Sequence, residues 1–272
     1  MKELQQIAYE VRKKLLQNIV KAGGGHTGGS MSSVDILVAL YFEVMNIDPE
    51  NPDKKGRDRF IMSKGHSVES YQAVLSRRGF FSEEVLDTYG DFDSILAGHP
   101  TRKVPGVEVN SGALGHGLSV GVGMALAAKR SGTGCRAFVL MGDGEQGEGS
   151  IMEAAAAAGH YHLDNLIAII DRNGLQISGK TEEVLSIENL KAKYQACSWS
   201  VRSCNGHDMN ELTTTLKDAP FEQGKPSLLI AHTVKGKGVS FMENIAAWHH
   251  KVPSTEQYQQ AMEELNLKLE GK

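Results

Sequence analysis

The feature that most constrains the fold is a pair of short apolar runs on either side of an alanine-rich segment. The runs cover residues 137–141 and 166–170, and the segment between them covers about 150–162. Each run has the length of a buried strand, and the segment has the length of a helix. We therefore predict a strand–helix–strand unit in an α/β protein with a mostly parallel central sheet and helices on both faces.

Polar residues follow both apolar runs. Gly142-Asp143-Gly144 comes directly after the first run, and Asn173 follows the second. Ligands of parallel sheets bind beyond the carboxyl ends of the strands, so neighbouring strands would bring this carboxylate and amide together beside the alanine-rich helix. Oxygen ligands of this kind suit Mg²⁺ or Ca²⁺, and a helix N-terminus suits a phosphate. We interpret the stretch as a metal–diphosphate site.

The same turn also matches the G-x-G-x-x-G pattern of dinucleotide-binding folds, with Asp171 near the position of the acid that binds the ribose. The pattern is formed by Gly142, Gly144 and Gly147. Three carboxylates in the turn argue against a bare pyrophosphate, because they would repel it unless a metal bridged the charges: Asp143, Glu145 and Glu148. A tight acidic turn without any ligand is the third alternative.

Size and charge exclude several classes of protein. A chain of 272 residues with 40% hydrophobic content fits one large α/β domain over residues 1–272. Its net charge of -4 argues against a general nucleic-acid binder. Since no long apolar stretch or signal peptide is apparent, we predict no membrane segment. Three cysteines without a C-x-x-C motif suit reduced thiols in a cytoplasm and give no metal cluster.

Apolar periodicity and turn residues predict the remaining elements. An amphipathic helix is expected over residues 3–21, and Ser32 or Ser33 is expected to cap a second helix that runs to about Met45. Further strands are expected at 60–62, 199–203 and 227–231. Further helices are expected at 68–78, 82–89, about 117–130, 187–197, 208–218 and 255–269.

Four turns on different elements carry a histidine: His26, His66, His99 and His249. No H-E-x-x-H motif or close histidine pair indicates zinc, and Asp143 with Asn173 suits a harder cation. Neutral histidines in a polar cleft bind hydroxyls and move protons, so together with a metal-anchored diphosphate they indicate sugar chemistry. Lys235 and Lys237 lie in a glycine-rich loop and could reach a phosphate, but two lysines in such a loop are expected to be solvated.

The order of these motifs resembles the diphosphate-binding domain of transketolase. The motifs are H-T-G-G, S-K-G-H, A-G-H-P, G-A-L-G-H-G and G-D-G, followed by Asn173. The G-D-G motif with this asparagine is similar to the signature shared by thiamine diphosphate enzymes, and the histidine turns are similar to the transketolase branch. The resemblance covers nearly the whole chain.

The resemblance implies roles for individual residues. Mg²⁺, or alternatively Ca²⁺ or Mn²⁺, would be bound by Asp143, Asn173 and the main-chain oxygen of Leu175. Thiamine diphosphate would be held at its diphosphate by His66, Gly142, Gly144 and the backbone near Asn173. Its aminopyrimidine would meet the backbone of Gly112, Ala113 and Leu114. Residues that would contact the sugar or assist proton transfer are His26, His66, His99 and His249. Glu148 and Glu153 match acidic residues at an interface between subunits, and Glu148 completes the predicted catalytic set.

The sequence departs from the family pattern at several positions. Arg172 replaces a frequent asparagine, and His116 replaces a frequent glutamine. His250 stands where glycine is usual, which leaves open whether His249 or His250 faces the substrate. Single-chain family members are more than twice as long, with a pyrimidine-binding domain and a C-terminal domain that we expect here on a separate chain.

The resemblance therefore predicts the N-terminal subunit of a split transketolase, paired with a second subunit in an α2β2 heterotetramer. The assembly would transfer a two-carbon ketol unit from a ketose phosphate to an aldose phosphate. Two alternatives remain: an NAD-dependent dehydrogenase that uses the glycine-rich turn, and a non-catalytic scaffold subunit.

Overall fold

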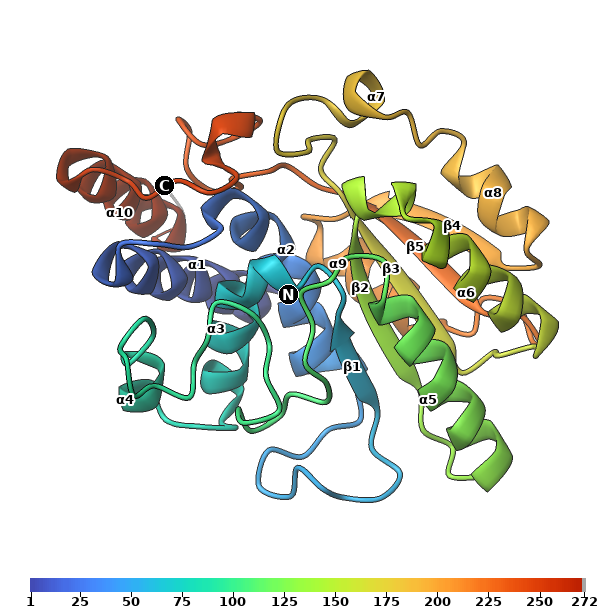
Figure 1. Ribbon diagram of the computed structural model, residues 1–272. Helices are drawn as coiled ribbons and strands as arrows, with labels where there is room; N and C mark the ends of the chain where they lie inside the picture. The colour runs from blue at the N-terminus through green and yellow to red at the C-terminus, as the bar shows by residue number, and fades with distance from the viewer. Residues whose placement is uncertain (271–272) are drawn as a thin grey trace.

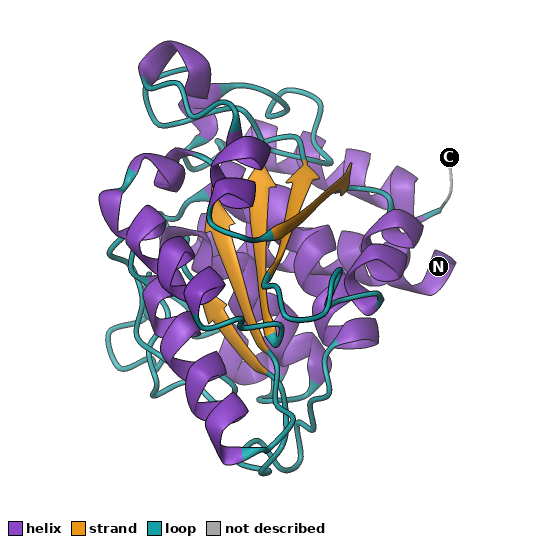
Figure 2. Ribbon diagram, turned by 90° about the vertical axis from the view of Figure 1, so that its right-hand side faces the viewer, coloured by secondary structure: helices purple, strands orange, loops and turns teal. Residues whose placement is uncertain are grey.

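A computed structural model describes residues 1–270. Its centre is a sheet of five parallel strands in the order β1-β2-β3-β5-β4. The strands are β1 (Arg59–Met62), β2 (Ala137–Gly142), β3 (Leu166–Arg172), β4 (Ser200–Asn205) and β5 (Ser227–His232). All carboxyl ends therefore meet at one edge, beyond which Figures 1 and 2 show a layer of loops and short helices.

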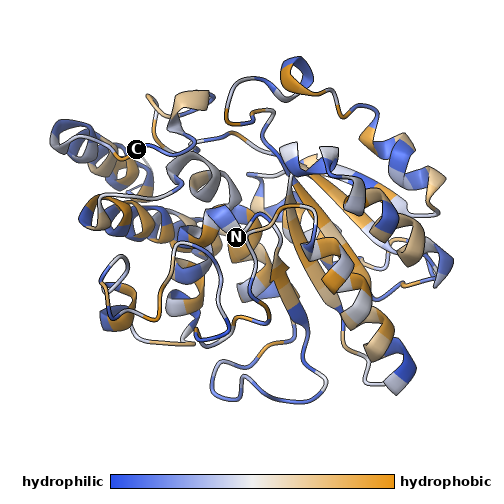
Figure 3. Cartoon of the chain, viewed as in Figure 1, coloured by the Kyte–Doolittle hydropathy of each residue, from blue (hydrophilic) through white to orange (hydrophobic). Residues whose placement is uncertain are grey.

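Strands β1, β2, β3 and β5 are mostly buried, whereas the edge strand β4 is mostly half-buried or exposed. Successive residues of the buried strands contribute to two separate cores. In β2, Phe138 and Leu140 belong to one core, whereas Val139 and Met141 belong to the other. This alternation explains why the apolar runs are continuous rather than alternating with polar residues. The apolar sheet between two layers of helices is visible in Figure 3.

Helices cover both faces of the sheet (Figure 1). One core includes residues of α1 (Lys2–Ala22), α2 (Thr27–Ala39), α3 (Val68–Arg78), α9 (Met209–Lys217) and α10 (Thr255–Leu269). The other includes residues of α5 (Gly117–Ser131), α6 (Gly149–His160) and α8 (Leu190–Ala196). Short elements are α4 (Glu83–Leu86), α7 (Thr181–Val184), a π-helical turn Leu40–Val44, and 3-10 turns Gly65–Ser67, Gly144–Gly147 and Ala246–Trp248. The predicted fold class is confirmed.

The start of α2 differs from the prediction. The helix begins at Thr27 with His26 as its N-cap residue, so Ser32 and Ser33 are buried inside it rather than capping it. The two glycines of the first turn permit close packing, since a Cβ on Gly28 would lie 2.8 Å from the Trp248 carbonyl oxygen. Local propensity predicted a turn here, and tertiary packing overrides it.

A buried polar chain fixes the loop after β5. Arg12 donates to Asp35 through both terminal nitrogens, at 3.1 and 2.5 Å. His207 Nδ1 also contacts Asp35, at 2.6 Å, and His207 Nε2 accepts from the Val234 amide at 2.8 Å. Since Nε2 accepts, the proton of a neutral His207 lies on Nδ1 and is donated to Asp35. The chain thereby connects α1 and α2 to the loop that carries Lys235.

Two further differences concern short elements. The helix expected at 82–89 ends at Leu86, and α7 lies in a segment for which we predicted no helix. None of the helices within residues 1–270 is long and apolar enough to cross a membrane. Cys135, Cys197 and Cys204 are all unpaired.

Candidate functional site

The turn after β2 is fixed by the buried carboxylate of Glu145. Its oxygens accept hydrogen bonds from the backbone of Gly115 at 2.8 Å and of Gly142 at 3.0 Å, and from the hydroxyl of Ser63. Burial raises the pKa of this carboxyl, and the three donors oppose that rise. One of the three carboxylates of the acidic turn therefore has an internal role: it ties the turn to β1 and to the loop before α5.

Asp143 lies beside the segment that follows β3. The register of the two strands pairs Gly142 with Asp171, and Asp143 Oδ2 accepts from the Gly174 amide at 2.6 Å. The prediction that neighbouring strands bring Asp143 and Asn173 to one edge is therefore confirmed.

Asp143, Asn173 and Leu175 line one cavity of about 430 Å³. They offer three kinds of oxygen that could bind a metal: a carboxylate, a side-chain amide and a main-chain carbonyl. Asn173 Oδ1 accepts from the Leu175 amide at 3.1 Å, which fixes the turn. In the part of the chain that the structure describes, no group of three His, Cys, Asp or Glu side chains is placed to hold a metal ion. A cation here would depend on amide and main-chain oxygens as well, which Mg²⁺ and Ca²⁺ accept.

The charge at this point also fits a cation. Burial, and then the nearby Asp171, raises the pKa of Asp143 above its usual value. A bound divalent cation would offset both effects, because it favours the ionised carboxylate.

The neighbouring backbone fits an anion. A Cβ on Gly144 would lie 3.0 Å from Cγ of Gln176, a tight contact that glycine avoids. The buried Nε2 of Gln176 has no hydrogen-bond partner among the residues described. Lys64 and Lys235 line the same cavity. An unused donor and two ammonium groups fit a diphosphate better than a neutral ligand.

Asp171 cannot serve as the ribose-binding acid of a dinucleotide site. Its side chain is fully buried and forms an ion pair with Lys64. Its oxygens also accept from the hydroxyls of Ser32, at 2.7 Å, and Thr233. Burial opposes ionisation, yet Lys64 holds the pKa of Asp171 below its usual value. The carboxylate is therefore used inside the protein.

The four predicted histidines converge around His26. Its ring centroid lies 5.2 Å from that of His66, 6.2 Å from His99 and 5.5 Å from His249. His250 is closer still, at 4.6 Å. Five imidazoles from four separate segments thus form one cluster, which we call the histidine cluster.

Three members of the histidine cluster are neutral at pH 7. Burial lowers the pKa of His26 to about 4, assisted by His250. Burial and Lys64 lower the pKa of His66 to about 2, and burial and Lys235 lower that of His249 to about 3. A neutral imidazole offers one donor and one acceptor, which is the pattern that a sugar hydroxyl can match.

Lys235 contradicts the expectation that it is solvated. It is 2% exposed, and burial, then Lys64, lowers its pKa to about 8. Its ammonium group contacts His249 Nδ1 at 2.8 Å and the Leu175 carbonyl at 3.3 Å. Because Nδ1 accepts from the lysine, a neutral His249 carries its proton on Nε2. The position of Lys235 just beyond a strand's carboxyl end was the signal for this role, and the same signal applies to Lys64.

The remaining predicted residues lie in or near this cavity. Gly142, Gly144, Gly112, Leu114 and Glu148 line it, whereas Ala113 is exposed and does not. His99 approaches the same loop, since a Cβ on Gly112 would lie 2.9 Å from its Cδ2. His249 lines the cavity and stacks against His66 at 5.3 Å, whereas His250 lines a separate hollow.

The sequence matches the family model for the thiamine diphosphate-binding domain of transketolase over residues 4–269. The chain belongs to this transketolase family. A protein of Phocaeicola vulgatus, named as one of the subunits of apulose-4-phosphate transketolase, is 55% identical over 259 residues, which cover 95% of this chain and 92% of that protein. A protein of the same name from Actinobacillus succinogenes is 46% identical over 97% of this chain and 96% of its own length. The 6-deoxy-6-sulfo-D-fructose transketolase subunit SqwG of a Clostridium species is 42% identical over 97% and 96%.

Solved transketolases have the same fold. The enzyme of Campylobacter jejuni superposes with a TM-score of 0.90 at 32% identity, and that of Leishmania mexicana with 0.91 at 29%. The match covers 97% of this chain in both cases, but only 43% and 41% of those chains. The chain therefore spans about two fifths of these transketolases, whereas it spans nearly all of the three relatives that are named as transketolase subunits.

These relatives confirm the predicted resemblance to an N-terminal subunit of a split transketolase. They favour the transketolase prediction over the dehydrogenase and scaffold alternatives, and the burial of Asp171 agrees with them.

Proposed function

We propose that the chain is the cofactor- and metal-binding subunit of a transketolase that moves a two-carbon ketol unit from a ketose phosphate to an aldose phosphate. The observation that carries this proposal is the cavity at the carboxyl edge, where Asp143, Asn173 and Leu175 lie beside a cluster of neutral histidines. Bound thiamine diphosphate would supply the nucleophilic carbon that ketol transfer requires.

The protein's oxygens would hold the metal. Asp143, Asn173 and the main-chain oxygen of Leu175 would bind Mg²⁺, with Ca²⁺ or Mn²⁺ as replacements. Gly144, His66 and the amides near Asn173 would then hold the diphosphate. The unused Nε2 of Gln176 supports an anion at this place.

The loop before α5 would support the aminopyrimidine. Gly112 has a φ of 148°, and the Ser111 hydroxyl donates to the Met62 carbonyl at 2.7 Å, which anchors the loop to β1. The backbone of Gly112 and Leu114 would pack against the flat ring, with Ala113 at the rim.

The histidine cluster would bind and orient the sugar. Because His26, His66 and His249 are neutral, each can hold a hydroxyl through one donor and one acceptor nitrogen, and their lowered pKa values make each a weak base that returns a proton readily. Lys235 keeps the proton of His249 on Nε2, the nitrogen not occupied by the lysine.

A second subunit would complete the site. The loop beside the cavity exposes three apolar side chains, Ile177 at 72%, Leu185 at 56% and Val184 at 44%. Neighbouring apolar side chains that are exposed mark an interaction surface. We infer that they contact a chain carrying the pyrimidine-binding and C-terminal domains, in an α2β2 heterotetramer with Glu148 and Glu153 near the interface.

The relatives indicate which substrates to test first. Because the two proteins named for apulose 4-phosphate are the more similar, a branched ketose phosphate is the first donor to test, and a sulfonated ketose the second. The residues that grip the phosphate would lie on the second subunit. A cytoplasmic location remains a prediction from the cysteines.

The test is to purify the assembly from its own cells through a tag on this chain. Native mass spectrometry should show two copies of each subunit with thiamine diphosphate and Mg²⁺. The assembly should transfer a ketol unit from apulose 4-phosphate to an aldose phosphate. A homo-oligomer that holds a dinucleotide, or an assembly whose activity is indifferent to His26, His66 and His99, would overturn the proposal.

A further inference from the structure

His250 is an exposed residue of a loop that is anchored by a hydrogen bond on each side. Trp248 is 3% exposed, and its indole donates to the Phe241 carbonyl at 2.9 Å. On the other side, the Lys251 carbonyl accepts from the hydroxyl of Thr27 at 2.7 Å. These anchors hold the chain on either side of His250, whose ring centroid lies 4.6 Å from that of His26.

The ring lines a second hollow of about 380 Å³, which we call the outer hollow. Most of its lining is bare backbone or apolar, from residues such as Gly24, Gly98 and Leu96. The hydroxyl of Tyr89 also borders it but already donates to Glu69 at 2.9 Å. The side chains free to bind a ligand are therefore imidazoles: His26, His99 and His250.

The outer hollow differs in charge from the cavity of about 430 Å³ described above, which we call the cofactor cavity. Lys64 and Lys235 line the cofactor cavity, whereas no Lys, Arg, Asp or Glu side chain is among the lining of the outer hollow in the described chain. Imidazoles and backbone groups suit hydroxyls, and the lack of a cation makes the hollow a poor place for a phosphate. It fits the uncharged, hydroxylated part of a ligand.

His26 connects the two spaces, because it lines both. A ketose whose carbonyl reacts in the cofactor cavity would pass His26 and place its next carbons in the outer hollow. There it would meet His99 on one loop and His250 on another. A glycine at position 250 would leave this part of the hollow wider.

We propose that His250 is a specificity-determining residue that contacts the sugar beyond its transferred two-carbon unit and limits the shape accepted there. This inference rests on the proposed function, since it assumes that a ketose reacts in the cofactor cavity. The imidazole of His250 can donate a hydrogen bond to a sugar hydroxyl or accept one from it. The ring also occupies part of the outer hollow, which limits whether a branched or an unbranched carbon chain fits there. His249, by contrast, serves the cofactor cavity.

The test uses the assembled enzyme with His250→Gly and His250→Gln. Steady-state kinetics would compare apulose 4-phosphate with the unbranched donors xylulose 5-phosphate and fructose 6-phosphate, and titration would give the Kd of thiamine diphosphate. His250→Gly should change the ratio of kcat/KM between branched and unbranched donors by about tenfold or more, mainly through KM. His250→Gln, which keeps a donor and an acceptor, should lie closer to the wild type.

Lys251→Ala is the matched control, because it alters the adjacent side chain, which lines neither space. It should leave the ratio of kcat/KM between donors unchanged. The Kd of thiamine diphosphate should be unchanged in all three variants. An unaltered donor ratio in His250→Gly, or a loss of cofactor affinity equal to the loss of kcat/KM, would overturn the inference alone. A wild-type assembly that transfers no ketol unit from any donor would overturn the proposed function with it.

Discussion

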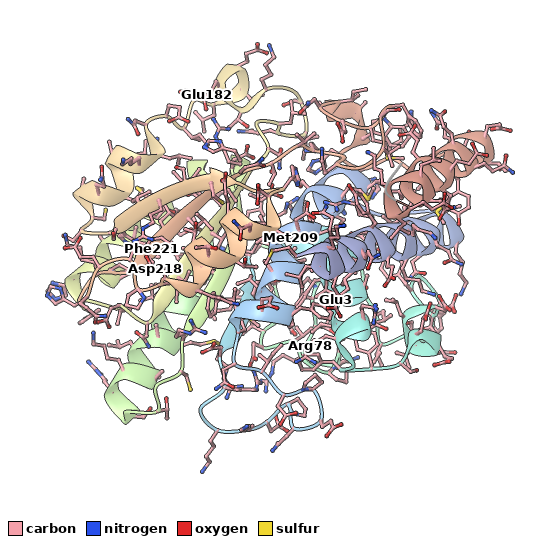
Figure 4. The ribbon with its side chains drawn as sticks, turned by 180° about the vertical axis from the view of Figure 1, so that it is seen from behind. Glu3, Arg78, Glu182, Met209, Asp218 and Phe221 are labelled. Atoms are coloured by element: carbon pink, nitrogen blue, oxygen red, sulfur yellow. The ribbon has the colours of Figure 1, made fainter. Side chains whose placement is uncertain are left out.

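The guanidinium of Arg172 donates to the carboxylate of Asp143 across 3.1 Å. Its other terminal nitrogen donates to Glu182 at 2.7 Å and to Glu188 at 3.2 Å. Figure 4 shows Glu182 on α7, beyond the carboxyl edge of the sheet. Arg172 therefore joins the proposed metal ligand to the segment 175–188 around α7. We assign the exposed apolar side chains of this segment to the interface with the second subunit.

The first prediction concerns this link. Arg172→Ala should release the segment 175–188, because it removes one cation shared by two glutamates. Limited proteolysis should cut this segment several-fold faster, while circular dichroism stays unchanged. Lys180→Ala, which removes only an exposed ion pair with Glu183, should not change the rate. Equal cleavage of the wild type and Arg172→Ala would contradict the link.

The second prediction concerns the metal. Asp143→Asn keeps the shape of the side chain but removes the charge that attracts a cation. Calorimetry with Mg²⁺ should show thiamine diphosphate binding weakened by about 100-fold or more. The exposed Asp218→Asn should bind as the wild type does. Normal Mg²⁺-dependent binding by Asp143→Asn would remove this residue from the metal site.

The third prediction concerns the donor beside the diphosphate. Gln176→Leu should raise the Kd of thiamine diphosphate about tenfold, because it removes a buried donor to an anion. Gln176→Glu should raise it further, since its charge repels the diphosphate. A Kd unchanged in both variants would mean that Nε2 faces another group.

The fourth prediction separates substrate contact from cofactor contact. His99 lines the outer hollow rather than the cofactor cavity. His99→Ala should therefore reduce kcat/KM about 100-fold or more while the Kd of thiamine diphosphate changes less than about twofold. If both quantities fell equally, His99 would have a structural role.

The fifth prediction follows from the lowered pKa values in the histidine cluster. The pKa of His26 is about 4 in the folded chain against 6.5 for an ordinary histidine, so between these values the unfolded chain binds more protons. The free energy of unfolding must then fall as the pH drops from 6.5 to 4. In urea titrations at pH 6.5 and 4.5, His26→Gln should lose less stability than the wild type. His160→Gln, which alters an exposed histidine, should lose as much stability as the wild type. An equal loss of the free energy of unfolding in all three proteins would show that the lowered pKa of His26 is not the cause.

The central unit was predictable because its pattern is local. The apolar runs of β2 and β3 fix two neighbouring parallel strands, and this placement alone brings Asp143 to Asn173. The burial of Lys235 was missed for the opposite reason, because it depends on contacts with α2 and with the 246–251 loop. Its position beyond a strand's carboxyl end was the only local signal. The start of α2 was missed likewise, because Gly28 and Gly29 serve contacts with Trp248 and Ser67. Which of His249 and His250 lines the cofactor cavity depends on the path of the backbone, and the spacing of residues in the sequence does not give that path.

The bond between Thr27 and the Lys251 carbonyl joins residues 224 positions apart. During translation, the first histidine of the cluster leaves the ribosome long before the last is made. The cluster is therefore assembled only after residue 250 has been synthesised, because contacts of such high sequence separation form late. A nascent chain that stops before residue 235 would have Asp143 and Asn173 but neither Lys235 nor His249, so the proposed metal ligands are made well before the histidine cluster is complete.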